Sequence, residues 1–427
     1  MTLEALQRRR DLALGAGAEL FYDEPLEIVR GEGVYLFDRD GRRFVDMYNN
    51  VPCVGHANPA VVEAMATQQA TVNVHNRYLH EGIVAFAERL AGLHHDGIES
   101  VVFSCSGTEA NEVAIQMART VTGHRGIVCT DAAYHGNSEL VGALTGVGTG
   151  RHPRHEIHGF PYPDLYRPIA PDLDQAELCD AYLAHVAAAI EELKSGGAGF
   201  AALILCPILA NEGLPEFPEE FMQKATELVH REGGLVIADE VQSGYGRTGR
   251  WWGYEGTGFR PDIVVTGKPM GNGLPLSATA ASREAVNAFR AGTGYFNTFS
   301  SSPLQAAVGM AVLDEIERLG LLANAAAVGD RLADELEKRL PLHEAIGDVR
   351  AYGLFIGVEM VTDKAGNTPD AGTARRLANR LKDHGFLTSY AGKFDNVLKI
   401  RPPLVFAEEH ADAFLEAFDA CMEELDG

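Results

Sequence analysis

Short apolar runs alternate with amphipathic stretches along most of this chain, beginning near residue 58. The amphipathic stretches repeat with the 3.6-residue period of a helix, as at 59–69, 82–93 and 109–119. Strands separated by helices favour a mostly parallel sheet with helices on both faces, so we predict an α/β fold. The apolar runs are rich in Val, Ile and Leu and are typical of buried strands; they occupy residues 101–103, 126–130, 201–205, 235–238 and 263–266.

The two ends of the chain carry a different pattern. Residues 26–46 contain three short strand patterns with an Asp-Gly turn between the last two, which predicts a small antiparallel unit. Strong amphipathic helices are predicted at 306–319 and 325–340, and shorter strands and helices follow them.

This organisation predicts two domains. The large domain would span residues 51–310, and the smaller α+β domain would combine residues 311–427 with the N-terminal segment 1–50. Residues 142–172 are rich in Gly, His and Pro, so we predict a long surface excursion there, suited to a lid over a site.

Composition narrows the class of protein. The 427 residues are 46% hydrophobic and can bury a large core, while 60 acidic against 36 basic residues give a net charge of -24. Such an acidic surface disfavours nucleic acid and membrane partners. The six cysteines are scattered without a C-x-x-C pair, which favours free thiols in a reducing cytoplasm over disulfides or a metal site.

A carboxylate and an amine follow two of the predicted strands. Asp239 comes directly after the strand at 235–238, and Lys268, one of eight lysines, follows the strand at 263–266. Side chains at strand ends project into the crevice where α/β proteins bind ligands. Burial there would lower the pKa of Lys268 and make it a nucleophile fit for a Schiff base. The alternative is an ion pair with Asp239 that only holds the sheet together.

A second candidate site lies between a predicted strand and helix. Ser106, Gly107 and Thr108 would place backbone N–H groups and hydroxyls at a helix N-terminus, where anions bind. The nucleotide-binding glycine signatures are missing, which favours a single phosphate monoester. The alternative is an ordinary capped helix with Ser106 or Thr108 as N-cap.

Tyr134 and His135 follow the strand at 126–130, so Tyr134 either lies over a flat heteroaromatic ligand or packs in the core. A phosphate site, a stacking aromatic ring, a carboxylate for a ring nitrogen and a lysine together are what pyridoxal phosphate chemistry requires. The combination is far more specific than any of its parts.

The chain resembles the class III aminotransferase family, which has the fold type I architecture, from about residue 20 to residue 425. The resemblance to the family lies in the motifs Ser106–Asn111, Tyr134–Gly136, Asp239–Gln242, Gly244–Gly249, Thr266–Lys268 and Asn297–Phe299. Further motifs are most similar to one branch, that of alanine–glyoxylate aminotransferase-like proteins and phosphoethanolamine phospho-lyases. They are Tyr48–Val51, Val54–His56, Arg77–His80, Gly267–Gly273 and Leu398–Leu404.

The resemblance implies a role for each matching residue. Lys268 would carry pyridoxal 5'-phosphate and Asp239 would bind its ring nitrogen. Thr298 would reach the cofactor phosphate of a neighbouring subunit, which implies a homodimer and leaves a tetramer open. The remaining cofactor contacts would come from Ser106, Gly107, Thr108, Tyr134, His135, Val241 and Gln242.

Two departures from the family pattern bear on the reaction. Cys206 stands where most members have a glutamate, and Lys399 stands where many have an arginine for the substrate carboxylate. The favoured activity is transfer of an amino group from a primary amine or ω-amino acid to a keto acid. The alternative is a phospho-lyase that eliminates phosphate from a phosphorylated amino alcohol. The candidate substrate ligands are Asn50, Arg77, Lys399 and Arg401.

Overall fold

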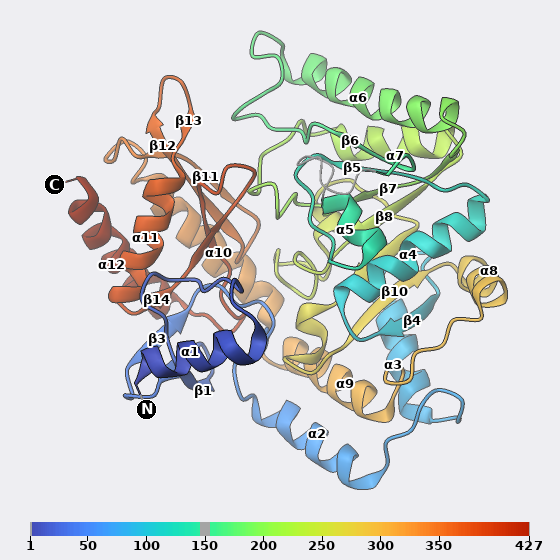
Figure 1. Ribbon diagram of the computed structural model, residues 1–427, viewed down its shortest axis with the longest axis horizontal. Coiled ribbons are helices and arrows are strands. Elements are labelled where there is room, and N and C mark those ends of the chain that lie inside the picture. Colours follow the sequence, from blue (N-terminus) through green and yellow to red (C-terminus); the bar gives the residue numbers. More distant parts are fainter. Residues whose placement is uncertain (1, 146–153, 427) are drawn as a thin grey trace.

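The computed structural model describes residues 2–145 and 154–426. Its largest sheet has seven strands and lies in the right-hand part of Figure 1. One strand, β10, runs against the other six, so the predicted mostly parallel sheet is confirmed. In spatial order the strands are β4 (Ser100–Ser104), β10 (Ser277–Ala281), β9 (Ile263–Thr266), β8 (Leu235–Asp239), β7 (Phe200–Leu205), β5 (Gly126–Thr130) and β6 (Ile157–Phe160).

Helices cover both faces of this sheet. Because side chains alternate along a strand, Val236 and Ala238 of β8 pack in one hydrophobic layer and Ile237 packs in the other. The layer of Val236 includes α3 (Glu81–Gly92), α6 (Gln175–Ser195), α7 (Phe221–Arg231) and α9 (Pro303–Arg318). The layer of Ile237 includes α4 (Gly107–Thr122), α5 (Glu139–Thr145) and α8 (Arg283–Thr293).

The two ends of the chain meet in the left-hand part of Figure 1. Phe386 pairs with Val45 in parallel, which joins a C-terminal strand to the N-terminal antiparallel unit. That sheet has the order β1 (Ile28–Glu32), β2 (Tyr35–Asp38), β3 (Arg43–Asp46) and β14 (Phe386–Leu387). The neighbouring sheet contains β11 (Ile346–Ala351), β12 (Ile356–Asp363), β16 (Val397–Ile400), β15 (Ser389–Ala391) and β13 (Thr368–Pro369).

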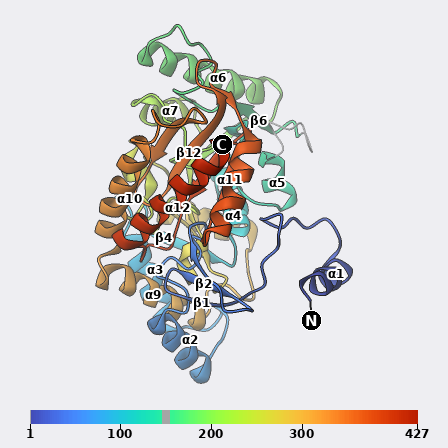
Figure 2. The ribbon, with the colours of Figure 1, turned by 90° about the vertical axis from the view of Figure 1, so that its left-hand side faces the viewer.

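Helices α10 (Leu321–Glu337) and α11 (Ala371–Asp383) pack on these smaller sheets, α12 (Glu408–Asp426) packs on both of those helices, and α2 (Pro59–Thr71) packs on α9. The helix α1 (Leu3–Leu14) buries none of its residues and stands apart from the body of the molecule in Figure 2. None of the helices in the described part of the chain combines the length and apolar composition that crossing a bilayer would need.

The structure corrects the sequence prediction at two strands of the large sheet. Strand β6 lies within the stretch 142–172 that we predicted to be a surface excursion, and residues 146–153 of that stretch lie outside the described residues. Strand β10 was missed because its side chains are small and lack the usual Val and Ile. Helix α4 approaches this strand closely, because Thr279 Oγ1 donates to the Ala110 carbonyl oxygen of α4 at 2.7 Å. Small side chains fit into the narrow space between the strand and the helix.

Candidate functional site

A pocket lies where the carboxyl ends of the large sheet's parallel strands meet the N-terminus of α4, the usual place for ligands in such sheets. Most of the cofactor residues predicted from the sequence line it. Its lining residues are Gly107, Thr108, Tyr134, His135, Gly136, Cys206, Asn211, Asp239, Val241, Gln242 and Lys268.

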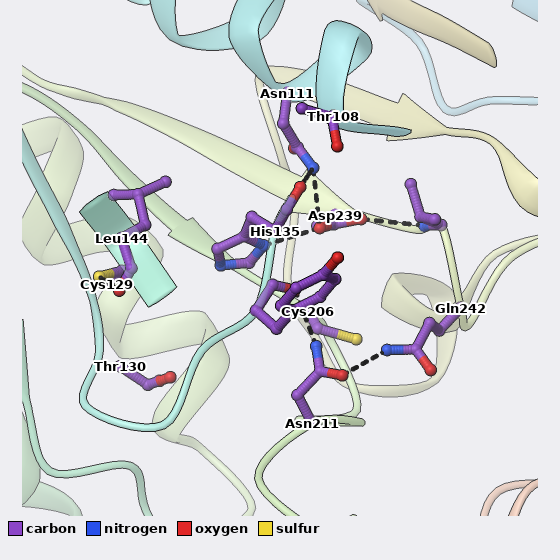
Figure 3. A network of polar contacts seen from close by, with 12 residues as sticks. Thr108, Asn111, Cys129, Thr130, His135, Leu144, Cys206, Asn211, Asp239 and Gln242 are labelled. Carbon is purple, nitrogen blue, oxygen red and sulfur yellow. Dashed lines mark hydrogen bonds and ion pairs between the residues drawn. The ribbon is translucent and has the colours of Figure 1, made fainter. Parts of the chain in front are cut away.

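Asp239 is held in place by three donors (Figure 3). Its Oδ2 accepts from His135 Nδ1 at 2.7 Å and from Asn111 Nδ2 at 3.0 Å, and its Oδ1 accepts from the Val241 N–H at 3.1 Å. Asn111 also donates to the His135 carbonyl at 2.8 Å. The alternation of side chains along β8 explains the orientation of the carboxylate. Asp239 lies on the same face of the sheet as Ile237, which is the face that α4 covers. The carboxylate is buried and fixed toward the pocket.

Lys268 occupies the turn that follows β9, where its side chain is partly exposed to the pocket and its amine is surrounded by protein. Burial lowers the pKa of its amine to about 8, and the positive charge of Arg401 lowers it further while Asp239 opposes the shift. Among the described residues Lys268 forms no ion pair with Asp239, so the purely structural ion pair considered from the sequence is not formed. The amine is suited to condense with an aldehyde.

This pKa predicts a pH dependence for cofactor loading. A neutral amine is the nucleophile, so a Lys268 with a pKa of about 8 is roughly one-hundredth neutral at pH 6 and half neutral at pH 8. We expect the rate at which the cofactor-free protein recombines with pyridoxal phosphate to rise between these values and level off above pH 8. Stopped-flow absorbance measures it. A rate that kept rising to about pH 10.4, the ordinary lysine value, would contradict the assignment.

Two glycines, Gly107 and Gly136, line the pocket at the N-terminus of α4, where the sequence predicts an anion site. A Cβ on Gly107 would lie 3.1 Å from the Val241 methyl groups, and one on Gly136 would lie 2.5 Å from Thr108 Oγ1. The first turn of α4 presents N–H groups that lack intrahelical partners. Ser106 is the N-cap of this helix, accepting from the Glu109 N–H at 3.2 Å, so the capping alternative holds for its side chain.

A chain of polar contacts leaves the pocket toward the small sheet. Asn211 Nδ2 donates to the Tyr134 carbonyl at 2.9 Å, and Asn211 Oδ1 accepts from Gln242 Nε2 at 2.7 Å. Gln242 Oε1 accepts from Lys399 Nζ at 3.0 Å and also from the Arg401 guanidinium. Two predicted substrate ligands, Lys399 and Arg401, are therefore brought next to the pocket.

Other predicted site residues lie elsewhere. Asn50 is buried behind the pocket, with its Nδ2 3.5 Å from the Val241 carbonyl oxygen. Arg77 is exposed and lies over the Phe296 ring at 4.1 Å, and Thr298 is also exposed. A single chain does not bring Arg77 and Thr298 to Lys268.

Sequence reasoning missed two residues of the site. Asn111 supports Asp239, and its place in the Ser106–Asn111 motif was the available signal. Asn211 had no local signal, because its role depends on partners about 30 and 77 positions away.

The residues present fit pyridoxal phosphate. His135 Nε2 and Asn111 Oδ1 are buried without hydrogen-bond partners among the described residues, beside a carboxylate and a reactive amine. The glycines leave room beside the first turn of α4, because a Cβ at Gly136 would collide with Thr108 and one at Gly107 would crowd Val241. Fold and site together define a pyridoxal-phosphate enzyme of fold type I.

Comparison with known proteins gives the family. The model of the class III aminotransferases matches residues 21–422, and the chain belongs to that family. The Drosophila melanogaster protein named alanine–glyoxylate aminotransferase 2-like is 38% identical, with 97% of this chain and 86% of that protein covered. A mitochondrial alanine–glyoxylate aminotransferase 2 homolog from Arabidopsis thaliana is 35% identical, with 98% and 87% covered.

A solved structure is also similar over nearly its whole length. It is a phospholyase from Arthrobacter in complex with phosphoethanolamine, 38% identical with a TM-score of 0.94, covering 98% of this chain and 99% of that one. The family and its solved members make pyridoxal phosphate the cofactor of this enzyme. The relatives carry the names of both aminotransferases and phospho-lyases.

Proposed function

We propose that this enzyme eliminates phosphate from a small primary amine that carries a phosphate on the next carbon, such as phosphoethanolamine. The observation that carries the proposal is the pair of buried basic side chains of Lys399 and Arg401, which converge on Gln242 beside Lys268. Neither forms an ion pair with a carboxylate of the described residues. Charges on both side chains would be costly in a site without a counter-ion, and a dianion offsets that cost better than a single carboxylate does.

The side chains divide the work of such a reaction. When bound, pyridoxal phosphate supplies a ring that withdraws electrons from the carbon beside the substrate's amino group. Asp239 would hold the ring nitrogen, and Lys268 Nζ would accept the proton from that carbon. A C=C bond then forms, the C–O bond breaks, and the electron pair leaves with the phosphate, whose charge Lys399 and Arg401 balance. Addition of one water to the released product yields an aldehyde and ammonia.

Two further observations support elimination. The Arthrobacter phospholyase, which was solved with phosphoethanolamine, matches this chain from end to end. Cys206 lines the pocket where the class III pattern usually has a glutamate, and burial raises the pKa of its thiol to about 12. The thiol is thus neutral at physiological pH, and it adds no negative charge that would repel a phosphate.

The test is incubation of the holoenzyme with phosphoethanolamine in the absence of any keto acid. We expect inorganic phosphate and acetaldehyde to appear together over many turnovers. Arg401→Met should raise the KM for phosphoethanolamine at least about tenfold, as expected for loss of a charge-assisted contact. Conversion of the cofactor to pyridoxamine phosphate without phosphate release would overturn the proposal.

Transamination is the second candidate, favoured by the family and by the names of the Drosophila and Arabidopsis relatives. It would use the same proton abstraction by Lys268 Nζ, and pyridoxal phosphate would serve as the carrier of the amino group. Incubation with L-alanine followed by absorbance spectroscopy distinguishes it. A shift of the cofactor band with formation of pyruvate supports an aminotransferase, and an unchanged band supports elimination alone.

We also propose that the enzyme is a homodimer in which Thr298 reaches the partner's site. The exposed side chains of Tyr78, Leu79 and Phe299 support this arrangement, because large apolar groups of this kind commonly mark an interface. Arg77 and Phe296 contact each other on the same surface. Sedimentation of the wild type and of Leu79→Asp tests the dimer, and a monomeric wild type would contradict the proposal.

We further propose a cytoplasmic location for the enzyme. The six free thiols support it, and cell fractionation is the test.

A further inference from the structure

Lys399 has an unusual environment for a lysine. It lies on β16, where it pairs with Gly357 and Ser389, and its side chain is buried. The Nζ atom donates to Gln242 Oε1 at 3.0 Å and lies 5.3 Å from the centre of the Phe355 ring. Gln242 Oε1 is also the acceptor for Arg401, whose guanidinium lies 5.3 Å from the same ring. One neutral amide oxygen therefore serves two basic side chains.

The charged groups that face Lys399 do not compensate it. Arg401 and Lys268 are both basic, and Cys206 is a buried thiol. The carboxylate that faces it, Glu212, is engaged elsewhere: its Oε1 accepts from the Thr130 hydroxyl and its Oε2 from the Asn211 N–H at 3.1 Å. Burial raises the pKa of Glu212, since it disfavours the charged carboxylate.

Burial is the largest cause of the shift in the pKa of Lys399. It holds the pKa of this amine well below the ordinary lysine value, and the charges of Arg401 and Lys268 act in the same direction. Arg401 differs, since burial lowers its pKa only to about 10 and it stays charged. Among the described residues, the only acceptor that the two side chains share is a neutral amide oxygen, so a second charge in the free site would have no counter-charge. One cation, Arg401, is therefore less costly there than two.

We infer that Lys399 binds the anionic group of the ligand by taking up one proton, passing from neutral in the free site to charged in the complex. The inference rests on the proposed function, because it concerns the anion that Lys399 and Arg401 would bind. The proton comes from solvent and stays on Nζ while the anion is bound. In the complex, a bound dianion lies beside two cations, Lys399 and Arg401. In the free site, Arg401 is the cation and Lys399 is neutral.

Sulfate is a suitable probe, because it resembles phosphate in shape and stays a dianion throughout the pH range needed. The experiment measures the Kd of sulfate for the pyridoxal-phosphate holoenzyme between pH 6.5 and pH 9. Linkage of one proton makes the Kd rise about tenfold per pH unit above the pKa of the free amine. The matched control is Lys399→Arg, whose guanidinium is charged throughout, and its sulfate Kd should change less than about twofold over the same range.

Calorimetry of the wild type in two buffers of different ionisation enthalpy gives the same answer without a variant. We expect an uptake of about one proton per sulfate near pH 8. Tight sulfate binding that is independent of pH and takes up no proton would overturn the inference and leave the proposed anion site intact. Failure of sulfate to bind or to compete with phosphoethanolamine would instead contradict the proposed function. A wild-type slope that Lys399→Arg retains would assign the proton to another group and also overturn the inference.

Discussion

Replacing Lys268 with alanine is expected to abolish turnover and the covalent attachment of the cofactor. The amine is buried, has a pKa of about 8 and lies in the same pocket as Asp239. Loss of a general base alone costs about a hundredfold to ten-thousandfold in rate, and the loss of the attachment point adds to this. Activity assays measure the first effect. Reduction with borohydride followed by peptide mass mapping measures the second.

Lys399→Met supplies the matched control. The amines of both lysines lie at the same site and are surrounded by protein, so a nonspecific effect of removing a lysine there would appear in both variants. We expect the Lys399 variant to keep a cofactor that borohydride fixes on Lys268, while its phosphoethanolamine KM rises. If Lys268→Ala still formed a reducible imine, a different lysine would carry the cofactor and the assignment would be wrong.

The strand ends could be predicted from the sequence because their signals are local. The apolar run before Asp239 and the one before Lys268 each form a buried strand, β8 and β9, and adjacent parallel strands bring their ends together. The seven-stranded, mostly parallel sheet follows from the same alternation. The physical reason is that burial on both faces of a sheet demands continuous apolar runs.

The support of Asp239 could not be predicted from local pattern. His135 and Asn111 lie 104 and 128 positions from Asp239 in the sequence, and their contacts form only when β5, β8 and α4 are packed. Strand β10 escaped prediction for a related reason. Its residues are small where α4 approaches closely, and apart from Thr279 they are Ser and Ala, which are not typical of strands.

The substrate side of the site was harder still. Lys399 and Arg401 are two positions apart on a strand of the small sheet, and their direction depends on how that sheet packs against the large one. Arg77 and Thr298 remain on the surface of a single chain, so their roles depend on the proposed partner. The sequence pattern indicates residue types suited to a phosphate, but the packing of the two sheets decides which of these side chains meet at the pocket.

Asp239→Asn is expected to lower turnover about a hundredfold to a thousandfold, the range seen when a preorganised electrostatic contact is lost. The substitution keeps the shape of the side chain and removes the charge that faces the ring nitrogen. Because Lys268 is unchanged, the cofactor should still be fixed by borohydride. The expected signature is a yellow protein with normal labelling and slow proton abstraction, measured by exchange of the substrate's α-hydrogen with deuterated water.

Glu240→Gln separates this effect from the loss of any buried carboxylate. Glu240 is the next residue, but strand alternation turns it to the other side of the sheet, where it accepts from Ser243 Oγ at 2.6 Å and from the Gly253 and Tyr254 N–H groups at 2.9 and 2.8 Å. Its replacement should cost about 1–3 kcal/mol of stability and leave α-hydrogen exchange within a few-fold of wild type. If Asp239→Asn exchanged the α-hydrogen as fast as Glu240→Gln, the negative charge at position 239 would have no part in the chemistry, and the site would have to be reassigned.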